Sequence, residues 1–178
     1  MQVLEEPLIT TRLEIVPVTA ELAAAARAGE DVFAEVLGAR LAPDWGPSSL
    51  GLVARSAAPA WGPVPLPTRA VAIHRTEGCV IGDMRFEPSL QAADEVEIGY
   101  SIAQSRRRQG YAVEMSGAVI DWLFHEGGAA EIVAGCDRKN VASVRTLRKL
   151  GFWLDGAAGR AFWWVLTPEL RREALVQF

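Results

Sequence analysis

The segment from Glu95 to Gly128 places a strand, a short basic loop and a helix directly one after another. In EVEIGYSIA, residues 95–103, every second side chain is apolar, which is the pattern of a strand with one buried face. In YAVEMSGAVIDWLFHEGG, residues 111–128, apolar residues recur at helical spacing until two glycines end the helix. Between them stand three arginines and a glycine, SRRRQG. The chain must therefore adopt a fold in which this loop joins a strand to a helix.

The rest of the chain predicts strands and helices in an order typical of an α+β domain. A strand over Leu8–Val18 leads into two short helices closed by glycines. From Leu41 to Thr68, prolines and glycines predict irregular structure with one helix near Ser49–Arg55. The later elements are the strands RAVAIHR and CVIGDMRFE, the strand AEIVAGC, the helix NVASVRTLRKLG, a hairpin of FWLDG and RAFWWVL, and a helix opened by Pro168. We expect one domain over residues 1–178, with a mainly antiparallel sheet flanked by helices.

Charge and composition exclude several classes of function. The formal net charge is −4 and the basic run is confined to one loop, so no broad basic surface is available for nucleic acid. The longest nearly uncharged run, Leu50–Thr68, is broken by prolines and cannot span a membrane. Two glutamates stand near the N-terminus without an apolar segment, so we expect no signal peptide and a cytoplasmic protein.

The cysteines and histidines give no sign of a metal site. Cys79 and Cys136 are far apart in the sequence, and His74 and His125 are isolated from other metal-binding side chains. Structural and catalytic metal sites need several such ligands at defined spacings. We therefore expect reduced, packed thiols and no bound metal ion.

The loop SRRRQGYA, Ser105–Ala112, is suited to an anionic ligand. A helix N-terminus presents unpaired N–H groups and the positive end of the helix dipole. Gly110 would let the backbone approach a phosphate closely, and the arginines would add positive potential around it. A solvated basic turn is the alternative interpretation of the same residues.

A family resemblance supports the anion site. The run RRQGYA, Arg107–Ala112, resembles the Q/R-x-x-G-x-G/A motif of the GNAT acyl-CoA N-acyltransferases. The resemblance covers about residues 8–167 apart from Leu50–Thr68. Within the family, the sequence is similar to the RimJ/RimL branch, which acetylates protein N-termini and includes small-amine acetyltransferases. The segments that carry it, in order, are TRLEIVPV, APDWGP, EIGYSI, GYAVE and NVASVRTLRKLGF.

The resemblance implies the GNAT fold with acetyl-CoA as co-substrate. In that fold the strands corresponding to Glu95–Ala103 and Ala130–Cys136 splay apart, and pantetheine lies in the opening. Asn140 would both cap its helix and bind pantetheine, although capping alone explains its presence. Arg106 or Arg108 could pair with the 3′-phosphate. The other implied coenzyme residues are Ile102 and Ala103 for pantetheine, and Arg107, Arg108, Gln109, Gly110, Tyr111 and Ala112 for the pyrophosphate.

The implied chemistry is direct attack of an unprotonated amine on the thioester. Glu97 is the candidate base, acting through water, and Glu95 on the same strand face is its competitor. A solvated strand-face role is the alternative for both glutamates. Ser143 matches a hydroxyl that lies near the coenzyme sulfur in the N-terminal acetyltransferase branch and can reprotonate it. Many GNAT enzymes place a tyrosine one turn further along this helix, where this chain has Leu147.

The acceptor is the least determined part of the prediction. It is a primary amine, either a protein N-terminus or a small molecule, and the loops Leu41–Thr68 and Asp155–Ala161 would select it. The acidic strand face favours a cationic amine. We expect most tryptophans in the core, with Trp45 as the exception that forms a pocket wall. At least one of Trp153, Trp163 and Trp164 could line the acceptor pocket. Dimers are common in the resembled branch, so a homodimer is allowed. The alternative function is a non-catalytic acyl-CoA-binding sensor.

Overall fold

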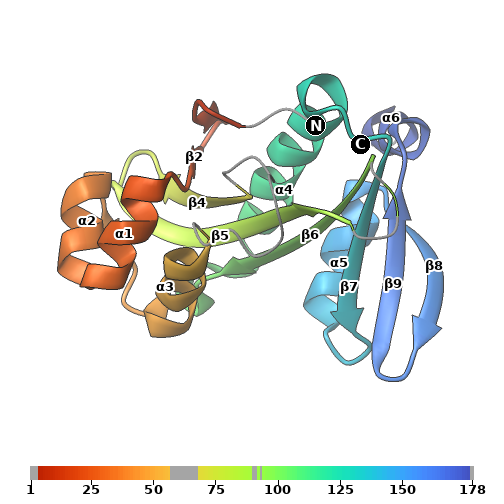
Figure 1. Ribbon diagram of the computed structural model, residues 1–178. Coiled ribbons are helices and arrows are strands. Elements are labelled where there is room, and N and C mark those ends of the chain that lie inside the picture. The colour runs from red at the N-terminus through yellow and green to blue at the C-terminus, as the bar shows by residue number, and fades with distance from the viewer. Residues whose placement is uncertain (1–3, 57–67, 90–91, 93, 177–178) are drawn as a thin grey trace.

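One mixed sheet runs through the molecule in the computed structural model, which describes residues 4–56, 68–89, 92 and 94–176 (Figure 1). Among these residues the strands lie in the order β1-β2-β4-β5-β6-β7-β9-β8, and β3 pairs with β5. The strands are β1 (Leu8–Ile9), β2 (Leu13–Pro17), β3 (Arg40–Leu41), β4 (Arg69–His74), β5 (Cys79–Pro88), β6 (Glu95–Ile102), β7 (Glu131–Asp137), β8 (Trp153–Ala158) and β9 (Ala161–Leu166).

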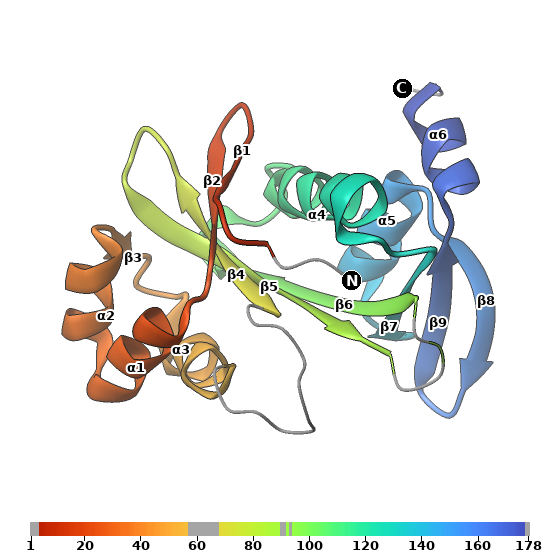
Figure 2. The same cartoon turned by 45° about the horizontal axis from the view of Figure 1, so that its top comes forward.

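Helices cover both faces of the sheet. They are α1 (Ala20–Ala28), α2 (Glu30–Leu37), α3 (Gly46–Arg55), α4 (Tyr111–Trp122), α5 (Val141–Leu150) and α6 (Pro168–Val176). A 3₁₀ turn, Gln104–Arg106, precedes α4, and a π-helical turn, Leu123–Gly127, follows it. Helices α4 and α5 lie on one face, and α1, α2 and α3 lie on the other, toward the β2–β4–β5 side (Figure 2).

Two sequence predictions need correction at the N-terminal side. The expected strand Leu8–Val18 is instead a hairpin of β1 and β2, because Thr10 closes a turn. The N–H of Thr10 donates to the Leu13 carbonyl oxygen at 2.9 Å, and the N–H of Leu13 donates to the Thr10 hydroxyl oxygen at 2.9 Å. The expected helix near Ser49–Arg55 begins earlier, at Gly46, with Pro47 in its first turn, where proline is well tolerated. The remaining residues of the Leu41–Thr68 prediction, 57–67, lie outside the described part.

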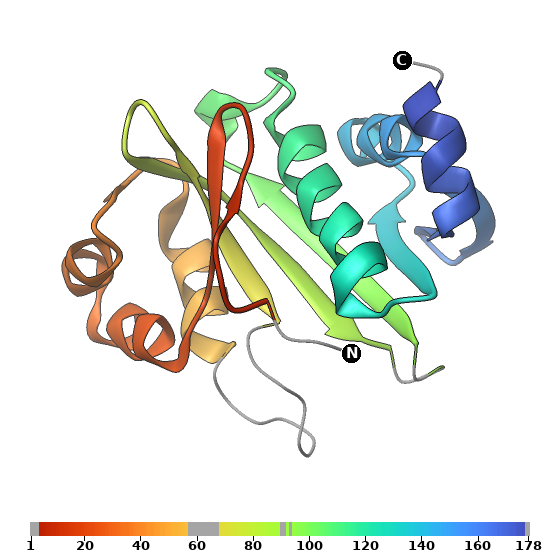
Figure 3. The same cartoon turned by 90° about the horizontal axis from the view of Figure 1, so that it is seen from above.

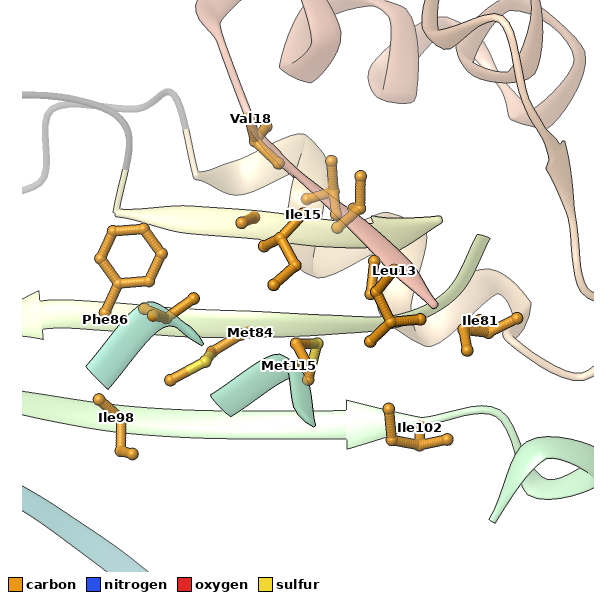
Figure 4. Packing of buried hydrophobic residues seen from close by; sticks show 14 of the residues in the cluster. Leu13, Ile15, Val18, Ile81, Met84, Phe86, Ile98, Ile102 and Met115 are labelled. Atoms are coloured by element: carbon orange, nitrogen blue, oxygen red, sulfur yellow. The ribbon is translucent and has the colours of Figure 1, made fainter. Parts of the chain in front are cut away.

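The core lies on both faces of the sheet, and the part that positions the site lies between the sheet and α4. Apolar side chains of β2, β5 and β6 meet Met115 of α4, as Figure 4 shows for Ile15, Met84 and Ile98 among others. The predicted alternation in β6 is confirmed, because Val96 and Ile98 are buried and the glutamates of this strand are not. This packing fixes α4 against β6 and so fixes the loop between them.

The sheet opens between β6 and β7. These two strands are parallel and pair only from Glu95–Glu131 to Ile98–Ala134. Beyond that point β6 stays paired with β5 as far as Ile102, whereas β7 stays paired with β9 (Figure 3). Among the described strands, β6–β7 and β3–β5 are the two parallel pairs, and the other pairs are antiparallel. The predicted mainly antiparallel sheet with a splayed strand pair is confirmed.

Candidate active site

The loop between β6 and α4 ends in an open helix N-terminus. Gly110 precedes α4 with φ 86° and ψ −3°, a left-handed conformation that favours glycine. Thr19 and Asn140 cap α1 and α5 with side-chain oxygens, but no described side chain caps α4. The N–H groups of Gly110 and residues 111–113 therefore lack intrahelical partners. They form a set of donors at the positive end of the helix dipole, which suits a bound anion.

The three arginines of this loop have different surroundings. Arg106 forms a two-bond ion pair with Glu77 of the turn between β4 and β5, and its Nη1 lies 2.8 Å from Oε1. Arg107 donates from Nε to the Ile102 carbonyl oxygen at 3.0 Å. Arg107 and Arg108 are exposed, and neither forms an ion pair within the described chain. Arg108 is better placed than Arg106 to meet a phosphate, because the Arg106 charge is already paired.

Backbone groups of β6 line the opening beyond its last pair with β7. The N–H of Ala103 donates to Ile81 on the β5 side at 2.8 Å. Because backbone groups alternate in direction along a strand, Tyr100 and Ile102 turn theirs away from β5 and toward the opening. Of the two residues predicted to pair with pantetheine, Ile102 faces the opening and the N–H of Ala103 does not. Tyr100 is a residue that the sequence interpretation missed.

Helix α5 lies beside the opening on the face of the sheet that also carries α4 (Figure 3). Asn140 Oδ1 accepts from the N–H of Ser143 at 3.1 Å, which is the predicted helix cap. The Tyr100 hydroxyl donates to the Ser143 carbonyl oxygen at 3.4 Å, so this side chain connects β6 to α5. Burial raises the pKa of Tyr100. Leu147 is buried in the core, and the hydroxyl groups near this part of the opening include those of Ser143, Tyr100 and Thr146.

The other face of the sheet carries a cavity of about 370 Å³ beside the first residues of β6 and β7. Glu97 points to this face because it alternates with the residues that face α4 and α5. Trp163 is 40% exposed and lies over Gly135, where an added Cβ would be 3.1 Å from its ring. We name this cavity the acidic hollow, since its lining includes four carboxylates, Glu95, Glu97, Glu131 and Asp155, together with Trp163.

The carboxylates of the acidic hollow differ in their partners. Glu97 Oε1 accepts from Arg85 Nη2 at 2.7 Å, and the same guanidinium donates to Glu87 at 2.8 Å. Glu131 lies opposite Glu95 across the β6–β7 pair. Burial, followed by the charge of Glu95, raises the pKa of Glu131. Glu131 was missed in the sequence, since only the fold brings the first residue of β7 beside Glu95.

The prediction for Trp45 is wrong about the core but agrees with the structure about a pocket wall. Trp45, expected as a pocket wall outside the core, is 3% exposed and stacks on Phe33 with ring centroids 6.1 Å apart. It also lines a second cavity, of about 250 Å³, between the start of α3 and the end of β6. Among the described tryptophans, the exposed indoles are those of Trp153 and Trp163 in the β8–β9 hairpin. Trp163 lines the acidic hollow, which agrees with the expectation that at least one tryptophan of this hairpin lines a pocket.

The described residues contain no group of three or more histidine, cysteine, aspartate or glutamate side chains placed to hold a metal ion. Both cysteines are free thiols, Cys79 buried and Cys136 half-buried. No helix in the described ranges has both the length and the apolar character needed to cross a membrane.

The fold and the site define an α+β protein whose sheet splits beside an uncapped helix. A family model described as an acetyltransferase (GNAT) domain matches residues 12–153. The chain belongs to this family. The acetyltransferase (GNAT family) from Bacillus anthracis superposes with a TM-score of 0.66 at 18% identity, over 92% of this chain and 99% of that one.

Two further comparisons agree with this family. Mycobacterium smegmatis RimJ, solved in complex with CoA-disulfide, matches with a TM-score of 0.58 at 19% identity, over 93% of this chain and 88% of RimJ. The resemblance to the RimJ/RimL branch is thus confirmed at the level of the fold. The N-acetyltransferase YjdG of Bacillus subtilis is 36% identical over 90 residues, 51% of this chain and 54% of YjdG. The chain therefore spans about half the length of this relative.

Proposed function

We propose that the protein transfers an acetyl group from acetyl-CoA to a primary amine. The observation that carries this proposal is the position of the opening: the free edge of β6 at Tyr100 and Ile102 leads directly to the uncapped N-terminus of α4. An extended amide chain can pair with such a strand edge while a pyrophosphate meets the helix amides. Membership of the acetyltransferase (GNAT) family supports the same assignment.

The residues present fit the coenzyme. The amides of Arg108–Ala112 would hold the pyrophosphate, and Arg108 would meet the 3′-phosphate. The amide of Arg107, which was also predicted to bind the pyrophosphate, already donates to the Gln104 carbonyl oxygen at 3.3 Å. The backbone of Ile102, with that of Tyr100, would pair with pantetheine. Asn140 uses Oδ1 as a cap, which leaves its Nδ2 to donate. The RimJ neighbour was solved with CoA-disulfide, which supports a coenzyme site in this fold. The coenzyme, when bound, supplies an acetyl group activated as a thioester.

The two proposed catalytic groups act from opposite faces of the sheet. Glu97 would accept the proton of the ammonium acceptor through a water molecule, on the side of the acidic hollow. Its hydrogen bond with Arg85 fixes where the carboxylate lies. Ser143 would donate a proton to the departing thiolate from the α5 side. Glu95 is the alternative base, because its side chain lines the same hollow.

We also propose that the acceptor is a cationic amine. Four carboxylates and the face of Trp163 line the acidic hollow, and this combination attracts an ammonium group by charge and by cation–π interaction. A small polyamine and the N-terminus of a basic peptide share this chemistry. Neighbours in this fold include an acetyltransferase of ribosomal protein L7/L12 α-amino groups, which supports a peptide as the second choice.

The test is acetylation of a panel of amines, in which the free CoA thiol released by the reaction is measured. We expect spermidine to be acetylated with a kcat/KM at least about tenfold above that of a neutral monoamine of similar length. Glu131→Gln should raise the KM for spermidine, whereas Glu35→Gln on α2 removes the same charge elsewhere and should not. Equal rates for charged and neutral amines would contradict the cationic acceptor.

Replacement of Ser143 by alanine is expected to slow the chemical step. We expect kcat to fall about 10- to 100-fold, because the thiolate loses a proton donor, while the Kd for CoA stays close to that of the wild type. Pre-steady-state thiol release measures the chemical step directly. Ala142→Ser, at the preceding residue of α5, is the control for helix stability. An unchanged chemical step would remove Ser143 from the proposed mechanism.

The same thiol assay separates the enzyme from a sensor. Tight binding of acetyl-CoA without turnover on any amine of the panel would favour the non-catalytic acyl-CoA-binding module. Turnover with any amine excludes it.

A further inference from the structure

We infer that Arg12, together with Glu114, sets the shape of the loop between β6 and α4, residues 103–110, and so determines the affinity for CoA without contacting the coenzyme. We name this segment the coenzyme loop. Arg12 is in this view a positioning residue. The inference rests on the proposed coenzyme site at the N-terminus of α4. It concerns a contact between segments about a hundred residues apart, the turn between β1 and β2 and the first turn of α4. We name this pair of side chains the clasp.

Glu114 receives four bonds from the turn between β1 and β2. Its Oε1 accepts from the Thr10 hydroxyl at 2.7 Å and from the Arg12 N–H at 2.8 Å. Its Oε2 accepts from Arg12 Nε at 2.7 Å and lies 2.6 Å from Arg12 Nη2. Both carboxylate oxygens are thus used: Oε2 meets two nitrogens of the guanidinium, and Oε1 accepts from the Thr10 hydroxyl and the Arg12 backbone N–H. These are charge-assisted bonds, which are stronger than bonds between neutral groups.

The remaining side of the guanidinium contacts the coenzyme loop. Arg12 Nη1 donates to the carbonyl oxygen of Gln109 at 3.0 Å. The guanidinium carbon lies 4.2 Å from the centroid of the Tyr111 ring. A Cβ added at Gly110 would lie 3.4 Å from Nη2. Arg12 therefore touches or borders each of the three residues that form the corner between the loop and α4.

The bond to Gln109 controls the direction of a proposed phosphate donor. The carbonyl of Gln109 and the N–H of Gly110 belong to one planar trans peptide, so they point in opposite directions. When Arg12 holds the carbonyl oxygen, the N–H of Gly110 must point away from Arg12. This N–H is the first of the uncapped donors of α4. The clasp thus aims the donor without occupying the space in front of it.

The clasp also removes a charge conflict. Glu114 lies in the first turn of α4, where an unpaired carboxylate would compete with a bound phosphate for the helix dipole. Burial by itself would raise the pKa of Glu114, but the bonds from Thr10 and Arg12 outweigh it and hold the pKa below its ordinary value. Glu114 therefore stays ionised, and Arg12 neutralises it locally.

The experiment measures the Kd for CoA by calorimetry in the full chain, with thermal unfolding measured in parallel. We expect Arg12→Gln to raise the Kd about tenfold or more, and Arg12→Lys to raise it less, because lysine keeps the charge but loses the fork. Arg75→Gln is the matched control. Arg75 donates to the carbonyl oxygens of Thr10 and Thr11 in the same turn, at 2.9 and 3.4 Å, but among the described residues it forms no hydrogen bond or ion pair with residues 105–110. It should leave the Kd unchanged.

Two further measurements separate positioning from direct phosphate binding. Glu114→Gln frees Arg12 from its ion pair: it should weaken CoA binding if Arg12 positions the loop, and strengthen it if Arg12 binds phosphate itself. The double variant Arg12→Gln with Glu114→Gln should have a Kd for CoA no higher than that of the single variant with the higher Kd, because the two side chains act as one unit. Acetyl-pantetheine, which lacks the pyrophosphate, should show no loss in any variant.

The outcomes distinguish the clasp from the proposed function. A wild-type protein that bound no CoA would overturn the proposed coenzyme site and the clasp with it. Wild-type binding of CoA with an unchanged Kd in Arg12→Gln, or tighter binding in Glu114→Gln, would overturn the clasp alone. An equal loss in Arg12→Gln and Arg75→Gln would also overturn it, since that pattern means general loosening of the turn.

Discussion

Replacing Gly110 by tryptophan is expected to raise the Kd for CoA at least about 100-fold, since it removes both the space and the geometry of the anion site. Gly110 has a φ of 86°, which costs any other residue about 1–2 kcal/mol. An added Cβ at this position would lie 3.4 Å from Arg12 Nη2, so an indole would crowd Arg12 and disturb the corner that carries the free N–H groups of α4. Calorimetric titration with CoA measures the loss.

Gly38→Trp is the matched control for this substitution. Gly38 ends α2 in the same left-handed region, with φ 69°, and a Cβ added there meets nothing within 4 Å. It carries a similar backbone strain and adds the same side chain far from the coenzyme loop. We expect Gly38→Trp to lower the unfolding temperature while the CoA affinity stays unchanged. Unchanged CoA affinity in Gly110→Trp would remove the anion site from this loop.

The coenzyme loop could be predicted from the sequence because its chemistry is local. A strand, a glycine and a helix in succession determine where free amides lie, whatever the rest of the chain does. The loop arginines show the limit of this reasoning. From the sequence, Arg106 and Arg108 were equal candidates for binding the 3′-phosphate. The structure distinguishes them, because the β4–β5 turn brings Glu77 to Arg106 and pairs its charge.

The parts of the site that were missed depend on contacts between distant segments. Arg12 was placed in the middle of a strand, although it lies in a turn that reaches Glu114. Glu131 meets Glu95 only because β7 pairs in parallel with β6. Tyr100 was assigned to a buried face, and its link to α5 depends on how far the strands separate. Alternation within one segment cannot report any of these contacts, and the splayed pair itself came from the family resemblance.

The aromatic residues illustrate the same limit in the other direction. Trp45 stands in a loop rich in proline and glycine, which favours exposure, but Phe33 of α2 stacks on it and completes the core. Trp163 and Trp164 are adjacent and therefore point to opposite faces of β9. Trp164 is buried and Trp163 borders the acidic hollow. Which of the two faces is solvated depends on the helices that cover the sheet, and α5 covers only one face.

Glu97→Gln is expected to lower kcat at neutral pH about 100-fold or more, with the Kd for CoA within about twofold of the wild type. Glutamine has the same shape, and its carbonyl oxygen can still accept the bond that Arg85 now donates to Glu97 at 2.7 Å. The substitution therefore removes the proton acceptor and keeps the local geometry. Steady-state thiol release with saturating amine measures kcat.

Glu87→Gln provides the control, because Glu87 lies directly opposite Glu97 and binds the same guanidinium at 2.8 Å. Loss of either carboxylate weakens the hold on Arg85, but only Glu97 lines the acidic hollow. We expect Glu87→Gln to keep nearly full kcat. Equal losses of kcat in Glu97→Gln and Glu87→Gln would mean that turnover depends on the position of Arg85 and not on Glu97 as a base. Full activity of Glu97→Gln with a loss in Glu95→Gln would assign the base to Glu95, and full activity of both variants would leave water as the proton acceptor.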